Sequence, residues 1–307
     1  MVPVFTLNNG STIPAIGLGS FMGKFGDNNE EARKVVGYRH IDTAAAYGTE
    51  AGVGAAIRNS GVSREEIYVV TKLAPGPHAA RVKEAFEESL AQLNVGYIDL
   101  YLMHWPQSDD PATGRTLQPD ESPNFVDTWK AMEKLLDTGK VKSIGVSNFS
   151  VKLLEILLAE TTIIPAVNQI EVHPLYPQFS TLEFCKSKGI VVTAYSPFGA
   201  GQKDLIEHPT LQEIGSRTHH SATQITMGWL LKKGVSAVPK SATHVRMVQN
   251  LKYAELSAED ETKIDDIHKA PGMHRMVWGF MCVDGKINGW TYEQLGWPLT
   301  DGGFVQE

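Results

Sequence analysis

Short apolar segments recur along the whole chain, separated by stretches of more polar composition. Those that read as β-strands cover residues 15–21, 38–44, 67–73, 97–105, 141–149, 165–172, 190–198 and 235–242. Several are apolar at consecutive positions rather than at alternate ones. This pattern is typical of parallel strands that are buried on both faces.

Amphipathic helical patterns lie between these segments. In residues 81–94, Val82, Phe86 and Leu93 fall on one stripe and acidic residues occupy the opposite face. Similar patterns predict helices over residues 126–140, 149–160, 179–189 and 221–234, and a shorter first helix within residues 30–36. Regular alternation of strand and helix indicates a (β/α)8 TIM barrel, an α/β fold.

An open, doubly wound sheet is the structural alternative. Such a sheet usually carries G-x-G-x-x-G directly after its first strand. Gly17 and Gly19 are present, but Met22 occupies the position of the last glycine. The fingerprint therefore fails, and the barrel is favoured.

Three segments stand outside the alternation. Residues 1–14 place Asn9-Gly10 between apolar flanks and predict a β-hairpin that could plug one end of a barrel. Residues 106–124 are rich in Pro, Asp, Ser and Gly and predict a long loop, whereas the C-terminal tail, residues 271–307, shows no clear period. No composition break suggests a second domain, so residues 1–307 are interpreted as one domain.

Composition narrows the function classes. The chain has 307 residues, 42% of them hydrophobic, and a net charge of −7, which argues against a nucleic-acid partner and against anionic lipid. No apolar run is long enough to span a membrane, and the N-terminus does not resemble a signal peptide. The two cysteines, Cys185 and Cys282, show no zinc spacing. We therefore expect a cytoplasmic protein without a bound metal.

Polar side chains occupy the ends of nearly all the predicted strands. They are Asp42 and the nearby Tyr47, Lys72, His104 with Trp105, Ser147 and Asn148, Gln169, Tyr195 and Ser196, and Lys240 with Ser241. Taken singly, each is more often a cap, a surface charge or a satisfied core residue; Asp42 or Thr43, for example, could cap the next helix. In a barrel, however, all of these positions converge on one rim, where active sites lie.

At these positions the chain resembles the aldo-keto reductases. The motifs that carry the resemblance are GYRHIDTAAAYGTEAGVG (37–54), IDLYLMHWP (98–106), VKSIGVSNF (141–149), NQIEVHP (168–174), AYSPFG (194–199) and VPKSATHVRMVQN (238–250). The similarity covers most of the chain before the tail, and the tail looks closer to fungal members that reduce ketones and α-dicarbonyl compounds.

The resemblance implies hydride transfer between the nicotinamide of NADPH and a carbonyl carbon of a small-molecule substrate. Tyr47 matches the family's proton donor. A free phenol has a pKa of about 10, so a buried Lys72 is expected to lower it, with Asp42 as the counter-charge of the lysine. His104 matches the residue that hydrogen-bonds and orients the carbonyl oxygen.

The same resemblance assigns cofactor contacts. Ser147, Asn148 and Gln169 match the positions that hold the nicotinamide carboxamide, and Tyr195 matches the ring on which the nicotinamide stacks. Ser196 begins a glycine-containing loop suited to the pyrophosphate. The remaining matches lie near a helix predicted to start at Thr243: Lys240, Ser241 and Arg246 for the 2′-phosphate, and Gln249 and Asn250 for the adenine.

For the substrate pocket we expect Phe21, Trp105 and Trp278. Many family members have a tryptophan where this chain has Phe21, which implies a smaller wall. Met281 and Trp297 are further candidates, with packing or a subunit contact as the equal alternative. Relatives of this kind suggest a monomer or a weak homodimer.

Other functions stay open at this point. One is a non-catalytic NADP(H)-binding regulatory subunit, against which the complete set of four catalytic residues argues. Another is an unrelated barrel hydrolase that uses Asp42 and His104 with a metal, for which no supporting ligand cluster is present. Within the reductase class, oxidation of an alcohol is the alternative direction.

Overall fold

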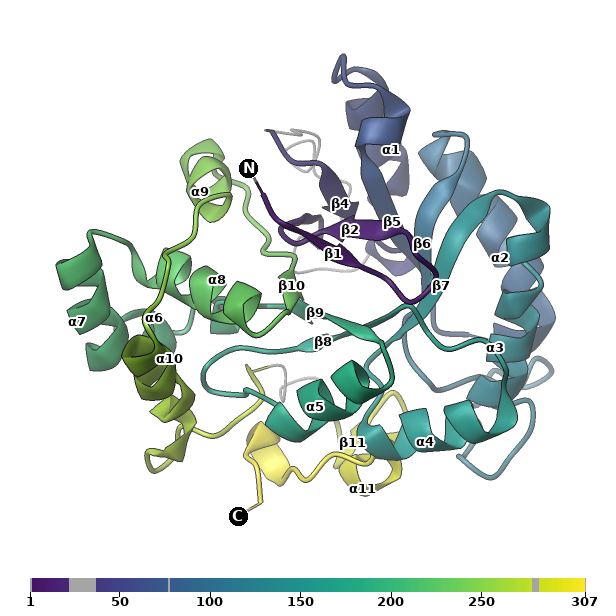
Figure 1. Cartoon of the computed structure of the whole chain (residues 1–307). Coiled ribbons are helices and arrows are strands. Elements are labelled where there is room, and N and C mark those ends of the chain that lie inside the picture. The colour runs from purple at the N-terminus through teal and green to yellow at the C-terminus, as the bar shows by residue number, and fades with distance from the viewer. Residues whose placement is uncertain (1, 22–36, 77, 278–281, 307) are drawn as a thin grey trace.

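Eight parallel strands form the centre of the molecule (Figure 1). The computed structural model describes residues 2–21, 37–76, 78–277 and 282–306. In chain order the strands are β3 (Leu18–Gly19), β4 (His40–Asp42), β5 (Tyr68–Leu73), β6 (Ile98–Met103), β7 (Val141–Ser147), β8 (Val167–Glu171), β9 (Val191–Tyr195) and β10 (Ser236–Ala237). Each lies within one predicted segment.

The sheet closes on itself at the seam between its first and last strands. Parallel bridges join Ile16 to Ala237 and Gly19 to Lys240. A Cβ atom at Gly19 would lie 2.8 Å from the carbonyl oxygen of Val238, so the glycine permits this close approach. The predicted (β/α)8 barrel is confirmed.

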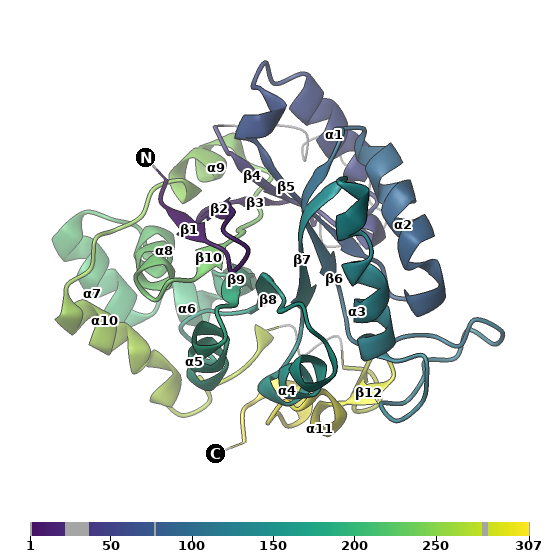
Figure 2. The same ribbon diagram turned by 45° about the vertical axis from the view of Figure 1, so that its right-hand side comes forward.

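Helices surround the barrel on the outside (Figures 1 and 2). They are α1 (Glu50–Arg58), α2 (His78–Leu93), α3 (Phe125–Glu133), α4 (Val151–Glu160), α5 (Phe179–Ser187), α6 (Lys203–Ile206), α7 (Pro209–Thr218), α8 (Ala222–Lys232), α9 (His244–Asn250), α10 (Ala258–Asp265) and α11 (Tyr292–Leu295). The helix expected within residues 30–36 lies outside the described residues.

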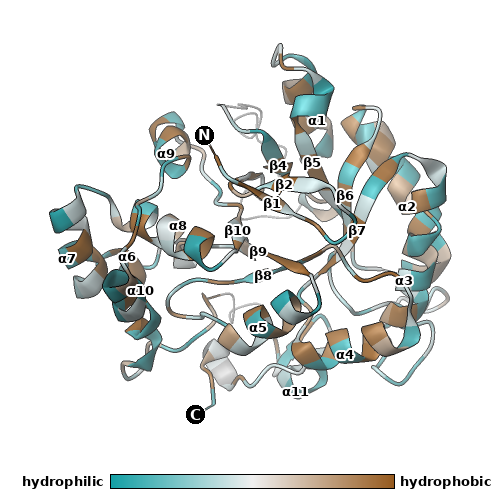
Figure 3. Cartoon of the chain, viewed as in Figure 1, coloured by the Kyte–Doolittle hydropathy of each residue, from teal (hydrophilic) through white to brown (hydrophobic). Residues whose placement is uncertain are grey.

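The amphipathic pattern of α2 explains how the helices cover the sheet. Val82, Phe86 and Leu93 are buried, and Glu84 and Glu88 face solvent. Figure 3 shows the same mixture of apolar and polar residues on several outer helices. The apolar stripe of each helix is thus removed from water against the barrel.

The N-terminal hairpin closes one end of the barrel. Strands β1 (Val4–Thr6) and β2 (Thr12–Pro14) pair antiparallel. Asn8 donates from Nδ2 to the Pro165 carbonyl at 3.0 Å, and Asn9 donates from Nδ2 to Ser143 Oγ at 2.8 Å. Ile13 is fully buried in a cluster that includes interior residues of the barrel. The hairpin therefore lies at the amino ends of the strands, opposite the predicted site.

The C-terminal tail packs against the long loop of residues 106–124. It contains β11 (Lys286–Ile287), β12 (Trp290–Thr291) and α11. Trp290 Nε1 donates to the Leu117 carbonyl at 2.7 Å, and Gln107 Nε2 donates to the Ile287 carbonyl at 2.9 Å. Between its described bounds the tail is thus folded onto the barrel, although its sequence shows no period.

Candidate active site

A cavity of about 790 Å³ lies at the carboxyl ends of the strands. The sequence-predicted residues that line it are Phe21, Asp42, Tyr47, His104, Trp105, Ser147, Asn148, Gln169, Tyr195, Ser196, Lys240, Ser241, Arg246, Gln249 and Asn250. Lys72 is fully buried next to Asp42, and Trp278 lies outside the described residues. The barrel thus brings residues from seven strands and their following loops to one cavity, and Lys72 on the remaining strand, β5, lies next to it.

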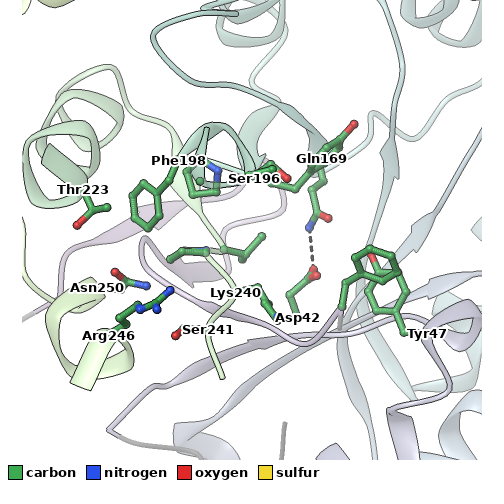
Figure 4. A pocket seen from close by; sticks show the side chains of 18 of the residues that line it. Asp42, Tyr47, Gln169, Ser196, Phe198, Thr223, Lys240, Ser241, Arg246 and Asn250 are labelled. Carbon is green, nitrogen blue, oxygen red and sulfur yellow. Dashed lines mark hydrogen bonds between the residues drawn. The ribbon is translucent and has the colours of Figure 1, made fainter. Parts of the chain in front are cut away.

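The cavity has two distinct ends (Figure 4). At one, which we call the Tyr47 end, Asp42 and Gln169 accompany Tyr47. At the other, the Arg246 end, Arg246 lies near Ser241 and Asn250. The first end is built from strands early and midway in the chain, and the second from the segment around α9.

A short turn presents Tyr47 at the rim. β4 ends at Asp42, and after an extended Ala44 the chain makes a 3₁₀ turn over Ala45–Tyr47. Gly48 ends the turn in the left-handed region, with φ of 70°, which favours glycine. The helix α1 has Thr49 at its N-cap, so neither Asp42 nor Thr43 caps it. The capping alternative for Asp42 is therefore wrong.

Asp42 instead pairs with Lys72. The ammonium of Lys72 donates to Asp42 Oδ1 at 2.6 Å and to the Thr43 carbonyl at 2.9 Å. Lys72 Nζ lies 5.0 Å from the ring centroid of Tyr47. The ring centroids of Tyr47 and His104 are 5.5 Å apart in an edge-to-face arrangement. The four residues that the sequence groups together are thus neighbours.

Burial and charge act in opposite directions on this cluster. Burial alone would lower the pKa of Lys72, but the Asp42 carboxylate and Tyr47 outweigh it, and the pKa is raised. Burial raises the pKa of Tyr47, and the Lys72 ammonium lowers it only in part. The expected net lowering of the Tyr47 pKa is therefore wrong for the protein without ligand, because loss of hydration disfavours the phenolate more than the lysine favours it. Tyr47 is a protonated phenol at neutral pH.

His104 is a neutral imidazole. Burial lowers its pKa well below the ordinary value, and the charge of Lys72 lowers it further. Its Nδ1 atom has no hydrogen-bond partner among the described residues. A neutral histidine can donate one hydrogen bond without carrying a charge of its own.

Hydrogen bonds connect the ends of β7, β8 and β9 beside these four residues. Asn148 adopts the left-handed conformation, with φ of 65°, which asparagine tolerates better than most residues. Its amide donates from Nδ2 to the His104 carbonyl at 3.0 Å and accepts from the Tyr195 hydroxyl at 2.9 Å. Ser147 donates its hydroxyl to the Gln169 carbonyl at 2.8 Å.

Gln169 crosses the mouth of the barrel. Its Nε2 atom donates to Asp42 Oδ2 at 2.7 Å, the contact drawn as a dashed line in Figure 4. The two strands involved, β8 and β4, are separated by three others in the sheet order. The sequence places both residues on the rim but gives no sign of this contact.

The Arg246 end carries two cations. Lys240 and Arg246 line the cavity, and neither has a carboxylate partner among the described residues. The Arg246 end therefore has positive charge available for an anion. The loop after β9 also contains Gly199 and Gly201, both with positive φ.

Several lining residues were not expected from the sequence. Ser221 and Thr223 line the cavity from the start of α8, and Phe198 lines it from the loop after β9; Figure 4 labels Thr223 and Phe198. Ser221 also caps α8 through the Gln224 backbone. The helix that follows a barrel strand begins on the side where that strand ends, and this rule could have placed both residues at the rim.

Trp297, a candidate for the pocket wall, does not line the cavity. It packs behind Trp105 instead, with ring centroids 6.1 Å apart. The tail thus supports a wall residue from behind. The other tail candidates, Trp278 and Met281, lie outside the described residues.

Two further properties bear on the class of site. Among the residues that the structure describes, no group of His, Cys, Asp and Glu is arranged to hold a metal ion. Within the same residues, no helix is long and apolar enough to cross a membrane. The fold and the site define a (β/α)8 barrel with a rim cavity that joins a buried acid–base cluster to a cationic end.

Comparison with known proteins agrees with this class. The model of the aldo/keto reductase family matches residues 30–269. Glycerol 2-dehydrogenase (NADP(+)) of Saccharomyces cerevisiae is 41% identical, covering 89% of this chain and 93% of the relative. Glyoxal reductase of Bacillus subtilis is 40% identical, covering 86% of this chain and 92% of the relative.

Solved structures give the same result. An aldo-keto reductase of Bombyx mori in complex with NADP superposes with a TM-score of 0.79 at 36% identity, covering 87% of this chain and 92% of that one. The chain therefore belongs to the aldo/keto reductase family. Yeast proteins are among these relatives, and the fungal resemblance of the tail stays a prediction.

Proposed function

We propose that the protein reduces aldehydes or activated ketones to alcohols with NADPH. The observation that carries this proposal is the buried Asp42–Lys72 pair beside Tyr47, at one end of a cavity whose other end is cationic. Family membership and the reductases among its relatives support the reaction class. The proposal also includes the reverse reaction, since the same groups serve alcohol oxidation.

The residues of the cavity fit NADPH. An aromatic face is present in Tyr195, and polar groups of Asn148 and Gln169 surround it at the Tyr47 end. Lys240 and Arg246 have no carboxylate partner among the described residues, and they suit the phosphate that distinguishes NADPH from NADH. When bound, NADPH supplies the hydride.

The chain's own residues then manage the proton. Tyr47 is protonated at neutral pH and can donate its proton to the oxygen of the carbonyl. The Lys72 ammonium compensates the negative charge that this leaves on the phenol oxygen, and Asp42 keeps the ammonium in place. Neutral His104 can donate a hydrogen bond to the same oxygen and so orient the carbonyl.

The substrate is proposed to be a small carbonyl compound, with α-dicarbonyl compounds included. Phe21 and Trp105 line the cavity beside Tyr47, and the centroids of the Phe21 and Tyr47 rings are 5.0 Å apart. Aromatic walls of this kind bind a compact, partly apolar molecule. The monomeric or weakly dimeric state and the cytoplasmic location stay predictions.

Replacement of Tyr47 tests the proton donor. We expect Tyr47→Phe to lower kcat for aldehyde reduction by about 10²- to 10⁴-fold, the range typical of a general acid. NADPH binding, followed by the change in protein fluorescence, should persist because the hydroxyl is lost without a change of shape. A variant with a kcat near that of the wild type would contradict the role.

The wild-type assay separates the enzyme from a regulatory subunit. NADPH oxidation should be measured on a panel of aldehydes, α-keto esters, diketones and sugars. Binding of NADPH with no oxidation on any member of the panel would favour the regulatory subunit.

A second prediction concerns the cationic end. Arg246→Ala should weaken NADPH binding by about tenfold or more, roughly 1.4 kcal/mol, and leave NADH binding nearly unchanged. His244→Ala is the matched control, because His244 is exposed on the same helix but does not line the cavity. Equal weakening of both dinucleotides would remove the 2′-phosphate role.

A further inference from the structure

Asp42 has two donors, one on each carboxylate oxygen. Lys72 donates to Oδ1 at 2.6 Å, and Gln169 donates from Nε2 to Oδ2 at 2.7 Å. Asp42 is 3% exposed, so water does not replace a lost donor freely. Both donors are therefore needed to satisfy the carboxylate in one orientation.

The backbone of Gln169 is itself held in place. The Ser147 hydroxyl and the Asn148 N–H both donate to the Gln169 carbonyl, at 2.8 and 3.0 Å. Gln169 is 2% exposed and ends its strand at the cavity. Its side chain thus reaches Asp42 from a fixed point on the opposite side of the barrel (Figure 4).

We propose that Gln169 is a positioning residue for proton transfer: it holds the Asp42–Lys72 pair, and through that pair it sets the ionisation of Tyr47. This inference rests on the proposed function and goes beyond it, because the resemblance assigns Gln169 only to the cofactor carboxamide. The same side chain retains Oε1, which accepts no hydrogen bond from the described residues. Gln169 can thus hold Asp42 through Nε2 and still offer Oε1 to the cofactor carboxamide.

The direction of the effect follows from charge. Lys72 favours the phenolate of Tyr47, whereas Asp42 disfavours it. Gln169 brings only a neutral donor to Asp42, so the pair stays close to electrically balanced. A carboxylate in its place would add negative charge near Tyr47 and oppose the phenolate.

Other ionisable groups face this cluster from neighbouring elements and form its background. His104 on the loop after β6 and Tyr195 on β9 lie in the cavity, and His40 on β4 and Glu50 on α1 interact with Lys72. None of these changes in a Gln169 variant, so a change in the titration of Tyr47 can be assigned to residue 169.

The decisive variants are Gln169→Glu, which adds charge, and Gln169→Met, which removes the donor at similar size. Tyr47 should be titrated in the cofactor-free protein by ¹³C NMR of labelled tyrosine, with its signal assigned from Tyr47→Phe. We expect Gln169→Glu to raise the pKa of Tyr47 by about one unit and Gln169→Met to raise it by less. The alkaline limb of kcat for reduction should move to higher pH by the same amounts, because reduction needs the protonated phenol.

Thr223→Val is the control. Thr223 lines the same cavity, and its hydroxyl pairs with Ser221 rather than with Gln169 or Asp42. Its replacement should leave the pKa of Tyr47 unchanged.

An unchanged titration of Tyr47 in both Gln169 variants would overturn the inference, and so would a shift of equal size in Thr223→Val. If Gln169→Glu does not fold, the titration of Tyr47 in Gln169→Met is sufficient to test the inference. Failure of the wild type to reduce any carbonyl would instead reject the proposed function, and the NMR titration would still report on Gln169.

Discussion

At the scale of single residues, the stretch from Asp42 to Tyr47 shows how one sequence feature can have two explanations. An aspartate before a helix usually caps it, and the sequence alone does not separate a cap from a counter-charge. The distinction depends on Lys72, which is 30 positions away from Asp42 and reaches it at 2.6 Å. Only the strand pairing of β4 with β5 brings them together.

His78 offers a prediction at the same scale. Burial lowers its pKa to about 4, and its Nε2 contacts the Ala74 carbonyl at 2.9 Å. In the unfolded chain histidine titrates near pH 6.5. Between these two values the unfolded state binds the additional proton, so the free energy of unfolding falls as pH is lowered from 6.5 to 4.

The expected contribution of His78 to this fall is about 3 kcal/mol. Urea unfolding at pH 7 and at pH 5 should show a smaller loss of stability for His78→Gln than for the wild type. An equal loss in both proteins would mean that folding does not lower the pKa of His78.

At the scale of elements, apolar patterning was enough to locate every barrel strand but not its ends. β10 covers only Ser236–Ala237 of the predicted residues 235–242. Pro239 has no N–H to offer a ladder, which shortens the strand. The location of the rim residues can be predicted because a barrel places the carboxyl ends of its strands together. The order of the motifs then indicates the role of each residue.

The elements without a period were not predictable. Trp297 is buried behind Trp105, yet nothing in the surrounding sequence indicates which of its faces packs. The sequence indicates Ser221 only as the start of a helix, although it also lines the cavity. Such contacts depend on where a loop returns to the barrel, which local propensity does not determine.

The contact between Trp297 in the C-terminal tail and Trp105 leads to a further prediction. Trp297→Ala removes the ring that supports Trp105, so the wall can shift into the space left behind. We expect KM for the carbonyl substrate to rise several-fold and the free energy of unfolding to fall by about 3–5 kcal/mol. NADPH affinity should hold, since Trp297 does not line the cavity.

Steady-state kinetics and urea unfolding measure both effects. Val283→Ala serves as the control, because Val283 lies in the same tail and is 68% exposed. An unchanged KM in Trp297→Ala would show that Trp105 needs no support from the tail.

At the scale of the whole molecule, one end of the barrel contributes to stability and the other carries the cavity. The hairpin closes the amino ends of the strands through Ile13, which is fully buried, and the cavity occupies the carboxyl ends. Ile13→Ala should therefore cost about 2–5 kcal/mol of stability without altering kcat/KM of the folded protein. Thermal unfolding together with kinetics at low temperature would test this; a lowered kcat/KM in the fully folded variant would show that the two ends are coupled.

The two ends of the cavity come from separate stretches of the chain. The acid–base cluster, Asp42, Tyr47, Lys72 and His104, is complete by residue 104, whereas Lys240, Ser241, Arg246, Gln249 and Asn250 fall within eleven consecutive positions. A chimera that exchanges only residues 239–250 for the matching segment of an NADH-preferring barrel should therefore change the dinucleotide used and retain the carbonyl chemistry. We therefore expect dinucleotide choice in this protein to depend on one exchangeable segment that is separate along the chain from the acid–base cluster.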